Sequence, residues 1–116
     1  MQTFFDVDIL NARTREGKSW LEFLRVPSLS MGVYHLKAGA DDPQRPHSED
    51  EVYYILGGWA KFRYGGQVQD VRPGTILFVE RHAEHRFFEI TEDLTALVFF
   101  APAEGSLSGA EMTGSS

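Results

Sequence analysis

Hydrophobic positions along the chain fall in short runs, separated by Gly, Pro and Asp, and helical periodicity is nearly absent. This pattern is typical of many short β-strands joined by turns. It predicts strands at residues 20–26, 31–36, 51–56, 59–64, 67–71, 75–79, 85–90 and 94–101. The predicted turns lie at Gly57-Gly58, Gly65-Gly66, Pro73-Gly74 and Thr91-Glu92-Asp93. About eight short strands indicate an all-β barrel or sandwich, because closure hides strand edges.

The two ends of the chain are less regular. Phe5, Val7 and Ile9 alternate with polar residues and could form an edge strand, although the pattern does not decide this. Residues 102–116 are small and polar, so we expect them to bury little and to form a flexible tail. The sequence therefore predicts a single domain over residues 1–101.

Charge and composition narrow the classes of function. The 116 residues carry a net charge of −6, which disfavours a nucleic-acid partner because phosphate backbones would be repelled. There are no cysteines, so disulfides and thiolate metal ligands are excluded. The first residues do not resemble a signal peptide, and no apolar stretch approaches the roughly 20 residues that span a membrane. We expect a cytoplasmic protein with no membrane partner.

One strand face begins with two residue types that bind metals. His47 and Glu51 are four positions apart, and side chains at i and i+4 of an extended strand share a face. Tyr53 and Ile55 would continue this inward row, and the opposite face would hold Val52, Tyr54 and Leu56. His85, just before another strand, is the best candidate for a third ligand. Two histidines and one carboxylate suit Fe, Mn, Zn or Ni and leave positions open.

Spacing alone leaves a second interpretation open, because a histidine near a strand end is often just solvated or hydrogen-bonded. The chain has two further histidines, and neither is expected in the site. His82 lies in a predicted turn and should face solvent. His35 lies within a strand, and we expect its ring to form hydrogen bonds with neighbouring residues there.

Two segments together resemble the paired motifs of the cupin superfamily. In the first, Gly39, His47, Glu51 and Gly58 fall at the family's intervals. In the second, Gly74 and His85 fall in place, whereas the motif's Pro, second Gly and Asn are replaced by Glu80, His82 and Glu89. The chain thus resembles a small single-domain cupin. The resemblance implies a double-stranded β-helix, or jelly-roll, barrel with a divalent metal held by His47, Glu51 and His85.

The sequence departs from the family's four-ligand pattern at one position. Arg45 stands where the first His is expected, and a guanidinium has no free lone pair for a metal. The amide oxygen of Gln44 could fill this fourth position. Arg45 could instead hold an anionic group of a substrate, or pair on the surface with Asp41 or Asp42. Some cupins bind no metal, so a metal-free structural barrel also stays open.

Residues near the expected ligands have functional and structural interpretations. Tyr53 could donate a proton or a hydrogen bond to a bound ligand, or simply fill the core. Phe87 and Glu89 should follow His85 inward by alternation, with Phe87 as a wall of the pocket. The sequence assigns no catalytic residue.

The resemblance implies metal-dependent chemistry on a small oxygen-bearing metabolite, of dioxygenase, isomerase, cyclase or decarboxylase type. Lewis-acid polarisation or O₂ activation would drive it. The alternative is a non-catalytic cupin that only binds a small molecule. Apolar side chains expected on the surface further predict a homodimer; they are Val52, Tyr54 and Leu56, or Phe4 and Phe5.

Overall fold

Two long strands run through the whole fold and position the candidate site. The computed structural model describes residues 1–43 and 45–108. Its elements are α1 (Asp6–Glu16), β1 (Trp20–Val26), β2 (Leu29–Leu36), β3 (Asp50–Tyr64), β4 (Gln67–Val71), β5 (Ile76–Val79) and β6 (His85–Ala101). All pairings between strands are antiparallel, and the sheet order is β1-β2-β6-β3-β4, with β5 also paired to β3.

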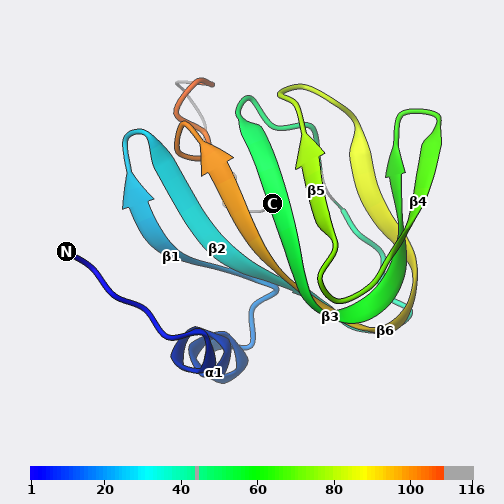
Figure 1. Ribbon diagram of the computed structural model, residues 1–116, viewed down its shortest axis with the longest axis horizontal. Coiled ribbons are helices and arrows are strands. Elements are labelled where there is room, and N and C mark those ends of the chain that lie inside the picture. Colours follow the sequence, from blue (N-terminus) through cyan, green and yellow to red (C-terminus); the bar gives the residue numbers. More distant parts are fainter. Residues whose placement is uncertain (44, 109–116) are drawn as a thin grey trace.

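The sheet bends so that its two halves face each other, as Figure 1 shows. Strands β3 and β6 pass through the bend together, and their register shifts three times between Ile55 and Lys61. One half contains β1, β2, β5, the first part of β3 and the last part of β6. The other half contains β4 with the remaining parts of β3 and β6. This antiparallel arrangement confirms the predicted β fold.

Two of the predicted turns are wrong, because β3 and β6 continue through them. Gly58 has a φ of 99°, and a Cβ at this position would collide with the backbone of Asp93 and Leu94. A glycine pair can allow a bulge and a bend as readily as a reversal of the chain. The Gly57-Gly58 pair therefore bends β3, and the expected turn at residues 91–93 is part of β6.

Alternation along β3 places its side chains as predicted. Glu51, Tyr53 and Ile55 are buried, whereas Tyr54 on the opposite face is exposed. The core lies between the facing halves of the sheet. Its largest members, all nearly unexposed, are Tyr53, Phe87, Phe100, Ile55 and Leu94.

The N-terminal segment is a helix, so the edge strand expected from Phe5, Val7 and Ile9 is wrong. Asp6 and Asp8 lie in the first turn of α1, and Arg13 and Arg15 lie in the last turn. Both pairs stabilise the helix because their charges interact favourably with its dipole. Gly17 ends the helix in a left-handed conformation and donates its N–H to the carbonyl of Arg13. Within the described residues, no helix has the length and apolar character needed to cross a membrane.

Residues 102–108 pack against the barrel after β6. Ala103 and Glu104 are almost completely buried, so the expectation that the tail buries little is wrong for this part. The rest of the expected tail, residues 109–116, lies outside the described residues.

Candidate metal centre

Three candidate ligands from separate parts of the sequence come together at one rim of the barrel. His47 lies in the loop before β3, Glu51 is the second residue of β3, and His85 is the first residue of β6. These strands begin at the same rim but in opposite halves of the sheet, at the top of Figure 1. One ligand atom from each residue lies within 4.8 Å of the other two. We call this cluster the candidate metal centre.

Buried polar atoms in this cluster lack hydrogen-bond partners. They are Nε2 of His47 and both carboxylate oxygens of Glu51, of which Oε1 has an ion pair with His85 Nε2 at 3.1 Å in place of a hydrogen bond. Glu51 is only 1% exposed, and burying polar atoms without partners is costly. A divalent cation would satisfy all three atoms at once. The donor set therefore fits such a cation on chemical grounds as well as by position, and the cluster could hold one metal ion.

The ring of His85 is oriented for coordination through Nε2. Its Nδ1 lies 2.9 Å from the Ala83 carbonyl, which can only accept a hydrogen bond, so Nδ1 carries a proton. Its Nε2 lies 3.1 Å from Glu51 Oε1 and 3.1 Å from the Tyr53 hydroxyl. Burial lowers the pKa of His85, but the adjacent Glu51 carboxylate and the Ala83 carbonyl raise it by a larger amount. The pKa of His85 therefore lies above its usual value. Protons and a metal ion would therefore compete at Nε2.

The ring of His47 lies between two carboxylates. Its Nε2 is 4.0 Å from Glu51 Oε1, and its Nδ1 is 3.6 Å from Glu104 Oε2. Burial lowers the pKa of His47, and the charge of Glu51 offsets only part of this effect. Burial also raises the pKa of Glu104 to about 8, and the negative charges of Glu51, Glu22 and Glu49 act in the same direction. Nothing in the local sequence pattern pointed to Glu104.

Aromatic side chains fill the interior beside the centre. Tyr53, Phe62 and Phe87 form mutual ring contacts, with centroids 4.8–5.7 Å apart. Phe87 points inward as predicted and is 1% exposed. Glu89 does not follow it, so that expectation is wrong. Its positive φ of 46° breaks the alternation, and the carboxylate lies on the surface, 3.2 Å from Lys61 Nζ.

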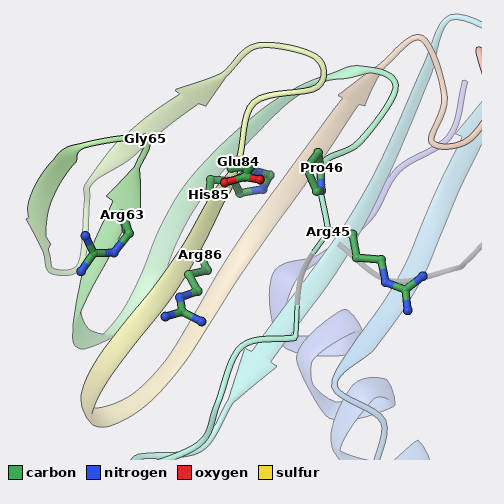
Figure 2. Close-up of a pocket in the computed structure, with 7 residues that line it drawn as sticks. All are labelled: Arg45, Pro46, Arg63, Gly65, Glu84, His85 and Arg86. Atoms are coloured by element: carbon green, nitrogen blue, oxygen red, sulfur yellow. The ribbon is translucent and has the colours of Figure 1, made fainter.

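A cavity of about 370 Å³ reaches the centre at His85. Three arginines line it: Arg63 from β3, Arg86 from β6 and Arg45 from the loop before β3. In Figure 2, Arg63 and Arg86 lie on one side of His85, and Arg45 lies on the other with its guanidinium directed away from them. Arg63 and Arg86 are paired directly across the two strands. Such a like-charge pair is unfavourable by itself. The Arg63 guanidinium lies over the Phe88 ring, 4.9 Å from its centre, and the acidic Glu84 also lines the cavity.

Asp42 is buried and links the loop before β3 to the core. Its two carboxylate oxygens accept hydrogen bonds from the Tyr34 hydroxyl (2.6 Å) and from the Phe87 backbone N–H (2.8 Å). Burial and the neighbouring Asp42 carboxylate raise the pKa of Tyr34. The sequence suggested Asp42 only as a surface partner of Arg45. The structure instead gives it a role in holding the loop that carries His47.

The other two histidines lie outside the centre, as predicted. His35 Nδ1 is 3.1 Å from the Thr95 hydroxyl, within the sheet. His82 is exposed and has a φ of 66°, and its backbone N–H donates to the carbonyl of His47. Gln44, considered as a fourth ligand, lies outside the described residues.

An antiparallel sheet folded onto itself, with two histidines and a glutamate at its rim, defines a small barrel protein with a candidate metal centre. Comparison with known families agrees with this class. Residues 32–101, more than half of the chain, match the family model described as the cupin domain. The chain therefore belongs to the cupin family.

Known relatives support this assignment. The uncharacterized protein SCO3923 of Streptomyces coelicolor is 40% identical over 101 residues, which cover 86% of this chain and 96% of that protein. The crystal structure of DMSP lyase DddQ from Ruegeria pomeroyi is similar at 28% identity and a TM-score of 0.62. That match covers 66% of this chain but only 39% of the lyase. An RmlC-like cupin from Shewanella frigidimarina shares the fold, at 18% identity and a TM-score of 0.68, over 76% of this chain and 78% of its own.

Proposed function

We propose that this cupin binds one divalent metal ion through His47, Glu51 and His85 and acts on a small, anionic, oxygen-bearing metabolite. The observation that carries the proposal is the convergence of three candidate ligands, two of which, His47 and Glu51, present buried atoms without hydrogen-bond partners. A bound ion would supply Lewis-acid polarisation of a substrate oxygen or, if it is iron, O₂ activation. Dioxygenase, isomerase and cyclase reactions use such chemistry, and Fe, Mn, Zn and Ni all suit the ligands.

The cavity arginines favour an anionic substrate. The chain has a net charge of −6, so an anion needs a local positive group in order to approach. Arg63 and Arg86 are exposed and line this cavity, and a carboxylate or phosphate placed between them would relieve their repulsion. Arg45, on the opposite side of the cavity, would engage the same anion by turning inward.

Residues behind the centre would exclude water and orient the substrate. The buried Tyr53 hydroxyl lies 3.1 Å from His85 Nε2, so it is placed to hydrogen-bond a ligand at the centre. Phe87 and Phe62 close the interior on that side. A dry environment strengthens each polar contact with the substrate, because the local dielectric is low.

A non-catalytic binding module is the alternative function, and one observation favours it. Tyr53 and Phe87 do not line the cavity, and the cavity touches the candidate metal centre only at His85. An anion could be held at the arginines without reaching the centre. The similarity to DMSP lyase supports the enzyme instead, since that relative is a lyase with the same fold.

Arg86→Gln should weaken binding of the anionic ligand about 10–100-fold, because hydrogen bonds to charged groups contribute roughly 1.5–3 kcal/mol. The test loads the protein anaerobically with Fe(II), Mn(II), Zn(II) or Ni(II). Small carboxylates and phosphate esters are then titrated by calorimetry, beside neutral amides and alcohols of matched size. The same panel is assayed for turnover with and without O₂. Turnover of a bound anion supports the enzyme, and binding without turnover supports the binding module.

Arg72→Gln is the matched control, since Arg72 is exposed and does not line the cavity. It removes the same charge from the surface and should leave affinity within about twofold of the wild type. The anionic class is wrong if neutral compounds bind as tightly as carboxylates. It is also wrong if the two arginine variants behave alike.

We further propose that the protein forms a homodimer through the outer face of β3 and β5. Ile76 and Phe78 are 68% and 64% exposed, and they pair in register with Tyr54 and Val52 of β3. A continuous apolar face of this kind is unusual on a monomer. Sedimentation at micromolar concentration should give twice the mass of one chain, and Phe78→Asp should give a single chain. A wild-type mass of one chain would refute the dimer.

A further inference from the structure

Residues 102–108 form a strap that is anchored on both sides of Glu104. On one side, the Ala103 N–H donates to the carbonyl of Pro27, and the Glu104 N–H donates to the Ser30 hydroxyl at 2.9 Å. The carbonyl of Glu104 accepts a hydrogen bond from the Arg25 guanidinium at 2.7 Å. These contacts fix the backbone from which the Glu104 side chain projects.

On the other side, the strap is bound to the loop that carries the candidate ligands. The buried carboxylate of Glu49 accepts hydrogen bonds from the backbone N–H groups of Gly105 (2.7 Å) and Leu107 (2.9 Å). Glu49 lies between His47 and Glu51 in the sequence. The strap is therefore bound to the segment that carries His47 and Glu51.

The side chain of Glu104 faces the ring of His47 without a hydrogen bond to it. Glu104 is 3% exposed, and its buried Oε2 has no hydrogen-bond partner. This oxygen lies 3.6 Å from Nδ1 of His47, on the side of the ring opposite the nitrogen that faces Glu51. Leaving a buried carboxylate oxygen unpaired is costly, so its position calls for a partner that forms in another state of the site.

We propose that Glu104 is a positioning residue for His47 and accepts the Nδ1–H hydrogen bond when the centre holds its metal. A movement of about 0.7 Å would bring the two atoms to the usual charge-assisted distance of roughly 2.9 Å. This bond keeps the proton on Nδ1, directs the Nε2 lone pair to the ion and makes the imidazole a stronger ligand. The inference rests on the proposed metal site.

Glu104 acts through His47 and is not itself a ligand. The candidate ligand atoms that lie within 4.8 Å of one another belong to His47, Glu51 and His85, and the cluster does not include Glu104. The arrangement is a carboxylate–histidine–metal relay, with the strap supplying the carboxylate. The strap thus becomes part of the binding site.

Zn²⁺ affinity of the full chain tests this role. Competition titration against a chelator should show Glu104→Ala binding Zn²⁺ about 10–100-fold more weakly than the wild type. Glu104→Gln keeps the side-chain size and an acceptor oxygen, so its loss of Zn²⁺ affinity should be smaller than that of Glu104→Ala. Glu92→Gln is the matched control. It removes an exposed acidic charge away from the strap and should change affinity by less than about threefold.

The proton position on His47 separates positioning from a purely structural role. Long-range ¹H–¹⁵N spectra of the Zn²⁺-loaded wild type should show His47 protonated at Nδ1, and Glu104→Ala should shift that signal and speed its exchange. Lower thermal stability in Glu104→Ala with unchanged Zn²⁺ affinity and His47 signals would overturn the inference and leave the metal site intact. A wild type that binds no Zn²⁺ through His47 would overturn the proposed function and this role together.

Discussion

Glu51→Ala is expected to weaken metal binding by more than the roughly 10–100-fold that loss of an outer-shell partner costs. The substitution removes the only carboxylate of the three-residue cluster and leaves two histidines with no charge to balance the cation. His47→Ala and His85→Ala should have effects of similar size. Calorimetric titration with Zn²⁺ or Mn²⁺ measures all three.

Thermal unfolding gives an independent readout of the same loss. A ligand that binds only the folded state at about 100 times its Kd stabilises it by roughly 2.7 kcal/mol, so metal should raise the Tm of the wild type. The three variants should show little or no such rise. His35→Ala and His82→Ala are the controls, because both side chains lie outside the cluster, and they should respond like the wild type. Loss of metal binding in His82→Ala, together with full metal binding in His47→Ala, would contradict the assignment of the ligands.

Asp42→Ala is expected to lower the free energy of unfolding by about 2–4 kcal/mol. The change leaves the Tyr34 hydroxyl and the Phe87 N–H without their acceptor, and each buried unsatisfied donor costs roughly 1–3 kcal/mol. Asp42→Asn keeps one acceptor oxygen and should lose about half as much. Urea unfolding measures the change through the midpoint at a constant m-value.

The neighbouring Asp41 provides a matched control for Asp42. It is exposed, so Asp41→Ala should change stability by no more than about 0.5 kcal/mol. Because Asp42 supports the loop that carries His47, its alanine variant should also bind metal more weakly. If the two aspartate variants unfold at the same urea concentration, Asp42 does not hold the loop.

Local periodicity was enough to predict the inward row of β3. Alternation placed Glu51 and Tyr53 on the buried face, and the structure agrees. The pairing of two cupin motifs then brought His85 to the same rim as Glu51, which no local pattern could do. The candidate ligands could therefore be identified from sequence because they combine a period-two strand with a recurrent family spacing.

Features that depend on competing local signals were predicted less well. The Gly57-Gly58 pair is compatible with either a hairpin or a bulge, and only the pairing of β3 with β6 on both sides of it selects the bulge. The helix at Asp6–Glu16 was missed because the alternation of three apolar residues hid its stronger signals. Those signals are acidic residues in the first turn, basic residues in the last turn and Gly17 at the end.

Asp42 and Glu104 were missed for a different reason. Asp42 accepts a hydrogen bond from the N–H of Phe87, which is 45 residues away in the sequence. Glu104 lies beside His47 only because a polar tail packs back onto the barrel. Polar residues in loops usually face solvent, so composition alone argued against burial. Only tertiary structure reveals these carboxylates as supports of the site.

Anomalous diffraction at the absorption edge of the bound metal tests the central claim most directly. Crystals of protein loaded with Zn²⁺ or Mn²⁺ should give one strong peak, roughly 2.0–2.2 Å from a ring nitrogen of His47, a ring nitrogen of His85 and a carboxylate oxygen of Glu51. The absence of a peak among these three residues, or a peak held by His82 and His85 instead, would contradict the account.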